Sequence, residues 1–271
     1  MAKSLKALAI DLDGTLLVGE DLPEGNREAV RAAADAGYHV IIATARWRQL
    51  AEKIVADIGL TDVLIIACSG AQVYCTKTKQ DIFDIRLPIE FVQELYTICN
   101  DNRCIASATV DSQTWLKIDR DPGPDDVSPG LVWVRSLPAP DQIPRIATVQ
   151  GSATIELVRD LHQRWKDEVQ IFNSIGPTGR IIITVTASGA DKGTALNAAC
   201  HHLSIDTDSV VAFGDAENDI MMFREAGVSV AMGQAEAAVK DAATHVTADH
   251  REDGVGVFIR GELFGNHPRP E

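Results

Sequence analysis

Four short aliphatic runs, each followed at once by polar residues, constrain the fold of this 271-residue chain most strongly. They occupy residues 8–10, 39–43, 63–67 and 210–213. Because apolar and polar residues do not alternate within them, the runs are typical of strands buried on both faces. Helical patterns at residues 23–36 and 47–58 separate the first three runs, and a glycine follows each helix. This order predicts an α/β fold with a Rossmann-like parallel sheet.

The C-terminal part repeats this pattern, whereas the middle of the chain differs. Asp191 is expected to cap a helix that ends near Leu203, and a second helix is expected from about Asn218 to Ala226. Residues 83–187 contain three of the four tryptophans and most of the prolines, and they mix helical and strand patterns. We therefore expect an α/β core domain formed by residues 1–82 and 188–271, with an α+β domain, residues 83–187, inserted between its two parts.

The balance of charges excludes some partners and implies others. The chain has 25 Lys and Arg against 39 Asp and Glu, a formal charge of −14, and no basic block, so we expect neither nucleic acid nor membrane as a partner. An anionic substrate would need a cation or basic groups at its site. The five cysteines show neither disulfide-framework nor zinc-site spacing, and the N-terminus lacks a signal-peptide pattern. We expect a cytoplasmic protein.

The first acidic group follows the first predicted strand. Asp11 and Asp13 stand two residues apart and are followed by Gly14, which would let backbone amides approach a ligand. An EF-hand loop is excluded because its twelfth position would be Leu22, where that loop needs Glu. The pair alone is compatible with a phosphoryl-transfer site, a metal site or chance. Its position at the end of a buried strand favours a functional role.

Other polar residues follow the remaining strands. Asp215, Asn218 and Asp219 come after the fourth run, where clustered carboxylates favour a hard cation such as Mg²⁺, although one of these residues would also suit a helix cap. Thr44 follows the second strand, where it could also be a simple helix cap. Lys192 begins a helix, where it could also be an ordinary surface lysine. Since parallel strands end at one sheet edge, we expect all of these groups to meet there.

Taken together, these segments resemble the haloacid dehalogenase (HAD) superfamily of phosphotransferases, most closely its Cof-type subgroup with a type II cap, of class IIB. The resemblance rests on five motifs, namely residues 11–17 (DLDGTLL), Thr44, residues 192–196 (KGTAL), residues 214–219 (GDAEND) and residues 231–235 (AMGQA). They cover the two predicted core segments. The resemblance thus implies a HAD core domain, and it implies that residues 83–187 form the cap that determines substrate specificity.

The resemblance also implies a role for each polar residue. Asp11 would be the nucleophile and Asp13 the general acid and base. Mg²⁺ would be bound by the Asp11 carboxylate, the Asp13 backbone carbonyl and Asp215. Thr44 and Lys192 would bind the phosphoryl oxygens. Asn218 and Asp219 would orient Lys192 and the metal ligands from behind.

Two departures from the subgroup concern the substrate. Thr-Ala-Arg ends the second strand where many relatives have Thr-Gly-Arg, and Ser69 stands where they have Asn; Arg46 and Ser69 are thus candidate substrate contacts. We expect a Mg²⁺-dependent phosphomonoester hydrolase, monomeric or homodimeric, acting on a small phosphorylated metabolite such as a sugar phosphate or a phosphoglycolate-like acid. A phosphomutase of the same superfamily is the first alternative, and a non-catalytic binding protein of the same fold is the second.

Overall fold

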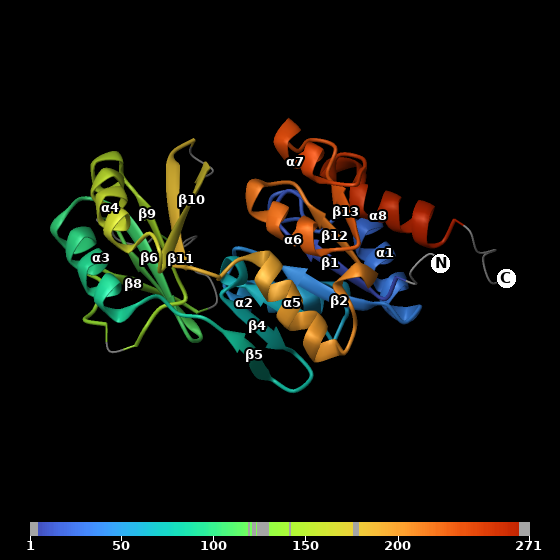
Figure 1. The fold of residues 1–271 in the computed structure, drawn as a ribbon, viewed down its shortest axis with the longest axis horizontal. Coiled ribbons are helices and arrows are strands. Elements are labelled where there is room, and N and C mark those ends of the chain that lie inside the picture. Colours follow the sequence, from blue (N-terminus) through green and yellow to red (C-terminus); the bar gives the residue numbers. More distant parts are fainter. Residues whose placement is uncertain are drawn as a thin grey trace. The chain divides into compact units, whose positions relative to one another are not determined.

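The chain divides into two compact units. A computed structural model describes residues 5–118, 120, 123, 130–140, 142–175 and 179–265. Unit 1 comprises Met1–Phe83 and Asp191–Glu271, and unit 2 comprises Asp84–Ala190. Figure 1 shows unit 1 with both chain ends and unit 2 as the segment inserted between its two parts.

Unit 1 is built on an eight-stranded sheet in the order β14-β13-β12-β1-β2-β3-β4-β5. All described pairs from β14 to β3 are parallel, which confirms the predicted α/β fold. The strands are β1 Ala7–Asp11, β2 His39–Ala43, β3 Leu64–Ala67, β4 Gln72–Cys75, β5 Gln80–Asp84, β12 Val210–Gly214, β13 Val228–Ala231 and β14 His245–Val246.

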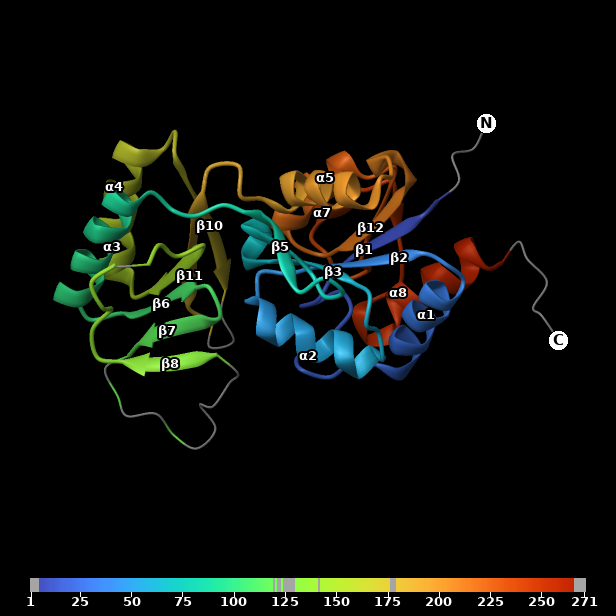
Figure 2. The ribbon, with the colours of Figure 1, turned by 90° about the horizontal axis from the view of Figure 1, so that it is seen from below.

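Helices cover both faces of this sheet, as Figure 2 shows with α5 and α7 on one side and α1, α2 and α8 on the other. Their bounds are α1 Glu24–Asp35, α2 Arg48–Ile58, α5 Lys192–Leu203, α6 Ile220–Glu225, α7 Ala237–Ala242 and α8 Gly254–Phe258. Asp191 caps α5 as predicted, because its carboxylate accepts hydrogen bonds from the amides of Gly193 and Thr194 at 2.8 and 2.9 Å. Gly59 ends α2 in the left-handed conformation.

Strand register brings distant parts of the sequence to one sheet edge. Asp11 pairs with Ala43 of β2, and Ile10 pairs with Phe213 of β12. The four central strands β12, β1, β2 and β3 run in the same direction, so the residues that follow each of them emerge at the same edge. Every residue of β1 and β12 is buried, which explains their unalternating aliphatic sequences.

Two details of unit 1 differ from the sequence-based expectation. The helix predicted from Asn218 begins only at Ile220, because residues 217–219 form a 3₁₀ turn that directs the Asp219 carboxylate back to preceding amides. Strands β4 and β5 were not predicted; β4 pairs antiparallel with β3 and extends the sheet. The sequence of β5, Gln-Asp-Ile-Phe-Asp, is too short and too polar to give a clear strand signal.

Unit 2 is a six-stranded sheet in the order β10-β11-β9-β6-β7-β8, with two helices on one face (Figures 1 and 2). Its pairs are antiparallel except β7 with β8. The elements are α3 Ile89–Asp101, β6 Ile105–Val110, β7 Gln113–Lys117, β8 Leu131–Val134, β9 Ile146–Gln150, α4 Ser152–Trp165, β10 Val169–Ile175 and β11 Ile181–Ala187. The helices and the sheet enclose a separate hydrophobic core that includes Phe91, Val149 and Val158.

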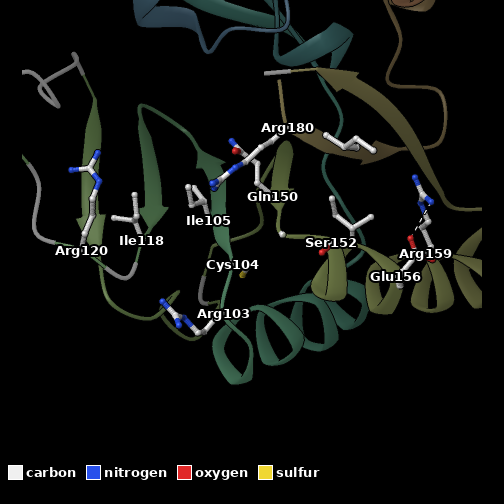
Figure 3. Close-up of a pocket in the computed structure, with 13 residues that line it drawn as sticks. Arg103, Cys104, Ile105, Ile118, Arg120, Gln150, Ser152, Glu156, Arg159 and Arg180 are labelled. Atoms are coloured by element: carbon white, nitrogen blue, oxygen red, sulfur yellow. Dashed lines mark hydrogen bonds and ion pairs between the residues drawn. The ribbon is translucent and has the colours of Figure 1, made fainter. Parts of the chain in front are cut away.

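A cavity of about 760 Å³ lies in unit 2 at the ends of β7 and β9 and the beginnings of β6 and β11 (Figure 3). The first half of α4 also lines it. Within the part of the chain that the structure describes, no helix is long and apolar enough to cross a membrane.

Candidate active site

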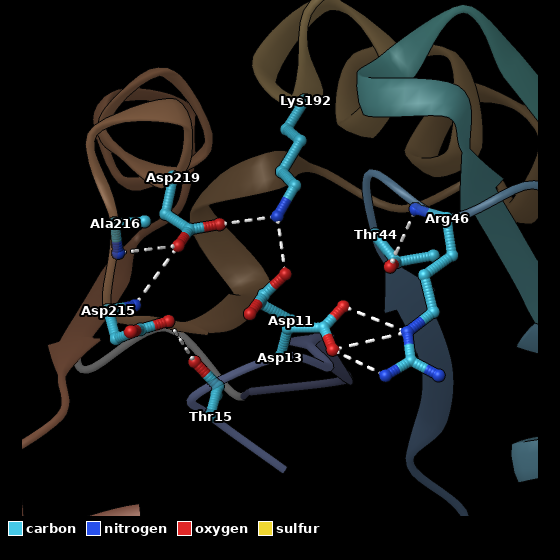
Figure 4. Close-up of polar contacts among 9 residues, drawn as sticks. All are labelled: Asp11, Asp13, Thr15, Thr44, Arg46, Lys192, Asp215, Ala216 and Asp219. Atoms are coloured by element: carbon cyan, nitrogen blue, oxygen red, sulfur yellow. Dashed lines mark hydrogen bonds and ion pairs between the residues drawn. The ribbon is translucent and has the colours of Figure 1, made fainter. Parts of the chain in front are cut away.

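A buried lysine connects two carboxylates at the carboxyl edge of the unit 1 sheet (Figure 4). The Nζ atom of Lys192 donates a hydrogen bond to Asp11 Oδ1 and another to Asp219 Oδ1, each at 2.6 Å. The side chains of Lys192, Asp11 and Asp219 are 1%, 8% and 0% exposed. Residues from β1, from the first turn of α5 and from the turn after β12 therefore share one charged contact, although 208 positions separate the first from the last.

Asp219 does more than bind the lysine. Its second oxygen, Oδ2, accepts hydrogen bonds from the backbone amides of Asp215 and Ala216, both at 3.0 Å. Both oxygens of Asp219 therefore accept hydrogen bonds from the protein, and these bonds hold the carboxylate in one orientation. Burial lowers the pKa of Lys192, but the nearby Asp11 and Asp219 raise it by more, so the lysine stays charged.

Asp215 completes an acidic cluster that suits a divalent cation. One oxygen each of Asp11, Asp215 and Asp219 lie within 4.8 Å of one another. Three carboxylates and one ammonium leave two uncompensated negative charges, which is the charge that a single Mg²⁺ neutralises. Burial, with Asp219 and Asp215 nearby, raises the pKa of Asp11 against the opposing effect of Lys192. Burial and Asp219 likewise raise the pKa of Asp215 to about 6, partly offset by Thr15.

The donor atoms also fit a metal in detail. Asp219 already uses both oxygens for protein contacts, whereas Asp11 Oδ2 has no hydrogen bond to a described residue. Asp215 Oδ1 accepts from Thr15 Oγ1 at 3.1 Å, which leaves its other oxygen for a cation. Asp11 and Asp215 are therefore better placed than Asp219 to be direct ligands. One residue before Asp219, the Oδ1 atom of Asn218 is buried without a hydrogen-bond partner among the described residues.

Gly14 is the residue that lets the two acidic segments approach each other. Its φ of +81° lies in the left-handed region, and a Cβ atom placed there would come within 2.4 Å of Asp215 Oδ2. The Gly14 carbonyl accepts a hydrogen bond from Gln234 Nε2 at 2.5 Å. Any side chain at position 14 would displace the Asp215 carboxylate or the loop that carries it.

Asp13 does not join the buried cluster. Its carboxylate is half exposed and accepts hydrogen bonds from Arg46, with Nε to Oδ2 at 2.9 Å and Nη2 to Oδ1 at 2.5 Å (Figure 4). The guanidinium of Arg46 also binds Glu20 at 2.9 and 3.0 Å. These hydrogen bonds to Asp13 and Glu20 outweigh burial and raise the pKa of Arg46. The described contacts of the Arg46 guanidinium are thus with two acidic residues of the protein, Asp13 and Glu20.

Thr44 and Ser69 lie in the neighbouring strand-end loops. Thr44 is fully buried, and its hydroxyl oxygen accepts a hydrogen bond from the Arg46 amide at 3.1 Å. The Ser69 amide donates to the Thr44 carbonyl at 3.1 Å, and Ser69 adopts a left-handed φ of +57°. Ser69 is 5% exposed. The two loops are therefore tied together, but neither side chain contacts the Asp11–Lys192 pair through a described hydrogen bond.

Sequence reasoning missed the residues that support this arrangement. Thr15 belongs to the DLDGTLL motif and Gln234 to the AMGQA motif. The motifs therefore contained both residues, but the sequence indicated no role for either. Glu20 carried no signal, because its contact with Arg46 joins two loops 26 positions apart.

Comparison with known proteins assigns the family. The sequence model of the haloacid dehalogenase-like hydrolases matches residues 8–259. The chain is 31% identical to the 5-amino-6-(5-phospho-D-ribitylamino)uracil phosphatase YcsE of Bacillus subtilis, over 94% of this chain and 95% of the relative. It is 28% identical to the pyridoxal phosphate phosphatase YbhA of Escherichia coli, over 96% and 99%.

The fold is also found among solved structures. A HAD subclass IIB sugar phosphatase superposes with a TM-score of 0.76 at 24% identity, covering 96% of this chain and 99% of the other. The structural similarity supports the assignment of the fold, whereas the sequence relatives support the assignment of the activity. The chain belongs to the haloacid dehalogenase-like hydrolases and is a phosphatase of the Cof type.

Proposed function

We propose that the protein is a Mg²⁺-dependent phosphomonoesterase that hydrolyses a small phosphorylated metabolite through an aspartyl phosphate on Asp11. The observation that carries this proposal is the buried contact of Lys192 with Asp11 and Asp219, beside Asp215. A structural ion pair would not need a third carboxylate at the same point, because like charges at short range repel each other. A divalent cation, bound here together with a phosphoryl group, would account for this excess of acidic residues.

In the first step an oxygen of Asp11 forms a bond to phosphorus as the ester P–O bond breaks. Asp13 gives a proton to the departing alcohol oxygen. In the second step water attacks phosphorus, Asp13 takes a proton from that water, and the Asp11–phosphorus bond breaks to release inorganic phosphate. The hydrogen bonds from Arg46 occupy both carboxylate oxygens of Asp13, so this contact must loosen before Asp13 can carry the proton that the alcohol receives.

Lys192 and Thr44 would bind the equatorial oxygens of the phosphoryl group. The Lys192 ammonium already lies against the attacking carboxylate, and Asp219 holds it there. Magnesium, bound by Asp11, Asp215 and the Asp13 carbonyl, would neutralise negative charge between carboxylate and phosphate. The buried side-chain oxygen of Asn218 has no hydrogen-bond partner among the described residues, which suits a water molecule in the outer shell of the ion.

For the substrate we propose a small organic phosphate, with a sugar phosphate or a phosphoglycolate-like acid as the first class to test. Relatives are named for a phosphoribitylamino uracil and for pyridoxal phosphate, and a protein of similar fold is a sugar phosphatase. These names share a phosphate monoester on a small molecule. Residues 83–187 are proposed as the cap that selects among such compounds, because they are inserted between the two segments that carry the catalytic motifs.

The direct test is phosphate release from p-nitrophenyl phosphate and from sugar phosphates, with Mg²⁺ or with EDTA. We expect turnover that needs Mg²⁺ and is abolished in Asp11→Asn, while Asp21→Asn, an exposed acid ten residues away, remains active. Borohydride reduction of the working enzyme should convert Asp11 to homoserine, detectable by mass spectrometry, if the acyl phosphate forms.

Each proposal has its own contrary result. Undiminished activity in Asp11→Asn contradicts the nucleophile assignment, and equal activity in EDTA contradicts the requirement for Mg²⁺. Isomerised sugar phosphate without release of inorganic phosphate would identify a phosphomutase instead.

A further inference from the structure

The first turn of α5 determines where the ammonium of Lys192 lies. Asp191 Oδ1 accepts hydrogen bonds from the amides of Gly193 and Thr194, and Asp191 Oδ2 accepts one from Thr194 Oγ1 at 2.9 Å. These bonds fix the residue at which the helix begins. The Lys192 side chain extends from this turn to Asp11 at 2.6 Å, so a shift of the turn would move the ammonium relative to the carboxylate (Figure 4).

Gly70 lets a second segment of unit 1 lie directly against Asp191. A Cβ atom at position 70 would come within 2.2 Å of the carbonyl carbon and oxygen of Asp191, and within 2.8 Å of its Cα atom. These are backbone atoms, which cannot move aside as the end of a flexible side chain can. The φ of Gly70 is +102°, a region that residues with a side chain rarely adopt. Position 70 must therefore be glycine for the Asp191 backbone to keep its place.

The turn that carries Gly70 follows β3 and has an unfavourable backbone conformation. Cys68 and Ser69 have φ values of +53° and +57°, which are uncommon for residues other than glycine. The Cys68 amide donates to the Arg46 carbonyl at 2.9 Å, and the Ser69 amide is tied to the loop after β2 in the same way. Such conformations persist only where the surrounding structure determines them. The turn is therefore a firm support against which α5 begins.

The residue on the other side of Lys192 is confined in a similar way. A Cβ atom at Gly193 would come within 2.6 Å of the Met221 carbonyl oxygen in α6. Gly193 thus lets the backbones of α5 and α6 approach each other closely. Residues 191 and 193 are each held by a backbone contact that needs glycine, one with the turn after β3 and one with α6. The main chain of Lys192 is therefore fixed at both ends.

We infer that Gly70 is a positioning residue for phosphoryl transfer, which acts through Asp191 on the ammonium of Lys192, and that Gly193 has the same role on the side of α6. Stabilisation of a transition state depends on charged groups that are in place before the reaction, so a displaced ammonium loses its effect although its charge remains. The inference rests on the proposed function, because it concerns the lysine that would bind the phosphoryl group.

The first test compares Gly70→Ala with Gly37→Ala in the full-length protein with Mg²⁺. Gly37 has a φ of +94°, close to that of Gly70, but a Cβ atom there meets no atom within 4 Å. Both substitutions carry the conformational cost of a positive φ, and only Gly70→Ala displaces Asp191. We expect kcat for p-nitrophenyl phosphate to fall about tenfold or more in Gly70→Ala while KM changes less than about threefold. Gly37→Ala should keep the natural kcat.

Orthovanadate gives a readout that a general loss of structure would not reproduce. It imitates the phosphoryl group during transfer, so its inhibition constant should rise in Gly70→Ala by about the factor by which kcat/KM falls. Gly193→Ala displaces the same turn from the side of α6 and should show the same pattern. It also replaces Gly70→Ala in the tests if that variant does not fold, because alanine suits the interior of a helix better than glycine does.

The second test needs no activity, so it separates failure of this inference from failure of the proposed function. Urea unfolding in EDTA at neutral pH is measured for Gly70→Ala, Asp11→Asn and the double variant. Gly70→Ala should lower the unfolding midpoint less in the Asp11→Asn protein, because the ion pair of Lys192 with Asp11 is already absent there. Gly37→Ala should lower the midpoint equally in both proteins.

Two results would overturn the inference. One is a kcat in folded Gly70→Ala, or in Gly193→Ala, that equals the kcat of Gly37→Ala. The other is a loss of stability in Gly70→Ala that adds to that of Asp11→Asn without coupling, since the glycine would then act independently of the Asp11–Lys192 pair. Absence of phosphate release by the natural protein would contradict the proposed function, and the coupling in stability would then decide whether Gly70 positions Lys192.

Discussion

Replacing Lys192 by methionine should destabilise the metal-free protein and should lower the activity of the protein with Mg²⁺, for separable reasons. Methionine has nearly the shape of lysine but no charge, so Asp11 and Asp219 lose the ammonium that each binds at 2.6 Å. Removing one partner from a buried ion pair costs about 3 to 5 kcal/mol, because the remaining charge is left desolvated. Lys192 has two such partners, both less than 10% exposed, so the upper part of that range is expected at neutral pH.

The pH dependence of this loss follows from the signs of the charges. Burial already raises the pKa of Asp11, and without the ammonium this pKa rises further above its unfolded value. A carboxyl with a raised folded pKa favours the folded state once it is protonated there. The destabilisation of Lys192→Met should therefore be full at neutral pH and shrink as the pH falls through the raised pKa of Asp11. Urea unfolding in EDTA at several pH values measures it.

A second substitution separates stability from catalysis. Lys192→Met combined with Asp219→Asn removes one of the two stranded charges, and the asparagine oxygen can still accept an amide hydrogen bond. This double variant should recover about half of the lost stability while kcat/KM stays reduced by a factor of about 10² to 10³ or more. Lys77→Met is the matched control, because Lys77 is exposed and pairs with Asp62 at the surface; it should leave the stability nearly unchanged.

Two results would refute this reasoning. One is a single variant as stable as the natural protein at neutral pH in EDTA. The other is a double variant that regains activity along with stability, since the lysine would then act only as a structural counter-ion.

The pKa of about 6 at Asp215 predicts that Mg²⁺ affinity falls about tenfold per pH unit below pH 6, as calorimetric titration would measure. The same carboxyl should cost the metal-free protein about 3 kcal/mol, a cost that develops as the pH rises from about 4 to 6. Gly14→Ala should lower stability by about 1 to 2 kcal/mol and also weaken Mg²⁺ binding, because its Cβ would collide with Asp215. Arg46→Met should lower kcat by about tenfold or more, since the Asp13 carboxylate would lose the hydrogen bonds that fix its orientation.

Each of these predictions has a control and a contrary outcome. Asp215→Asn should abolish the pH-dependent part of the stability difference, and Mg²⁺ affinity that is equal at pH 5 and pH 7 would contradict the Asp215 prediction. Gly19→Ala also has a positive φ, +63°, but meets no atom within 4 Å, so it should lower stability and leave Mg²⁺ binding intact. Glu20→Gln removes the negative charge that pairs with the same guanidinium and leaves the Asp13 contact in place; a kcat that falls equally in this variant would argue against a specific role of the Arg46–Asp13 contact.

The fold of unit 1 was largely readable from the sequence because its strands are buried on both faces. Such strands consist of unbroken aliphatic runs, and the helices between them end at glycines, so local patterns are strong. Unit 2 contains the mixture of helices and strands that the sequence of residues 83–187 predicted. The short strands β4 and β5 escaped prediction, since four or five residues with mixed polarity give little periodic signal.

Because only local sequence patterns can be interpreted in advance, they also limited what could be predicted of the site. A strand end is a local feature, so Asp11, Thr44 and Asp215 could be assigned to one sheet edge in advance. Direct contacts are not local. Arg46 was expected near the substrate, but the described contacts of its guanidinium are with Asp13 and Glu20, and the expectation that it binds substrate remains a prediction.

The sequence by itself determined the order of buried strands and the acids at their ends, because hydrophobic periodicity and turn chemistry are properties of short segments. Only the tertiary structure decided that Lys192 lies between Asp11 and Asp219, and that position 14 must be glycine for Asp215 to approach. These arrangements depend on strand pairing and side-chain packing between residues tens to hundreds of positions apart. Their free energies arise from desolvation and charge at short range, which no local pattern encodes.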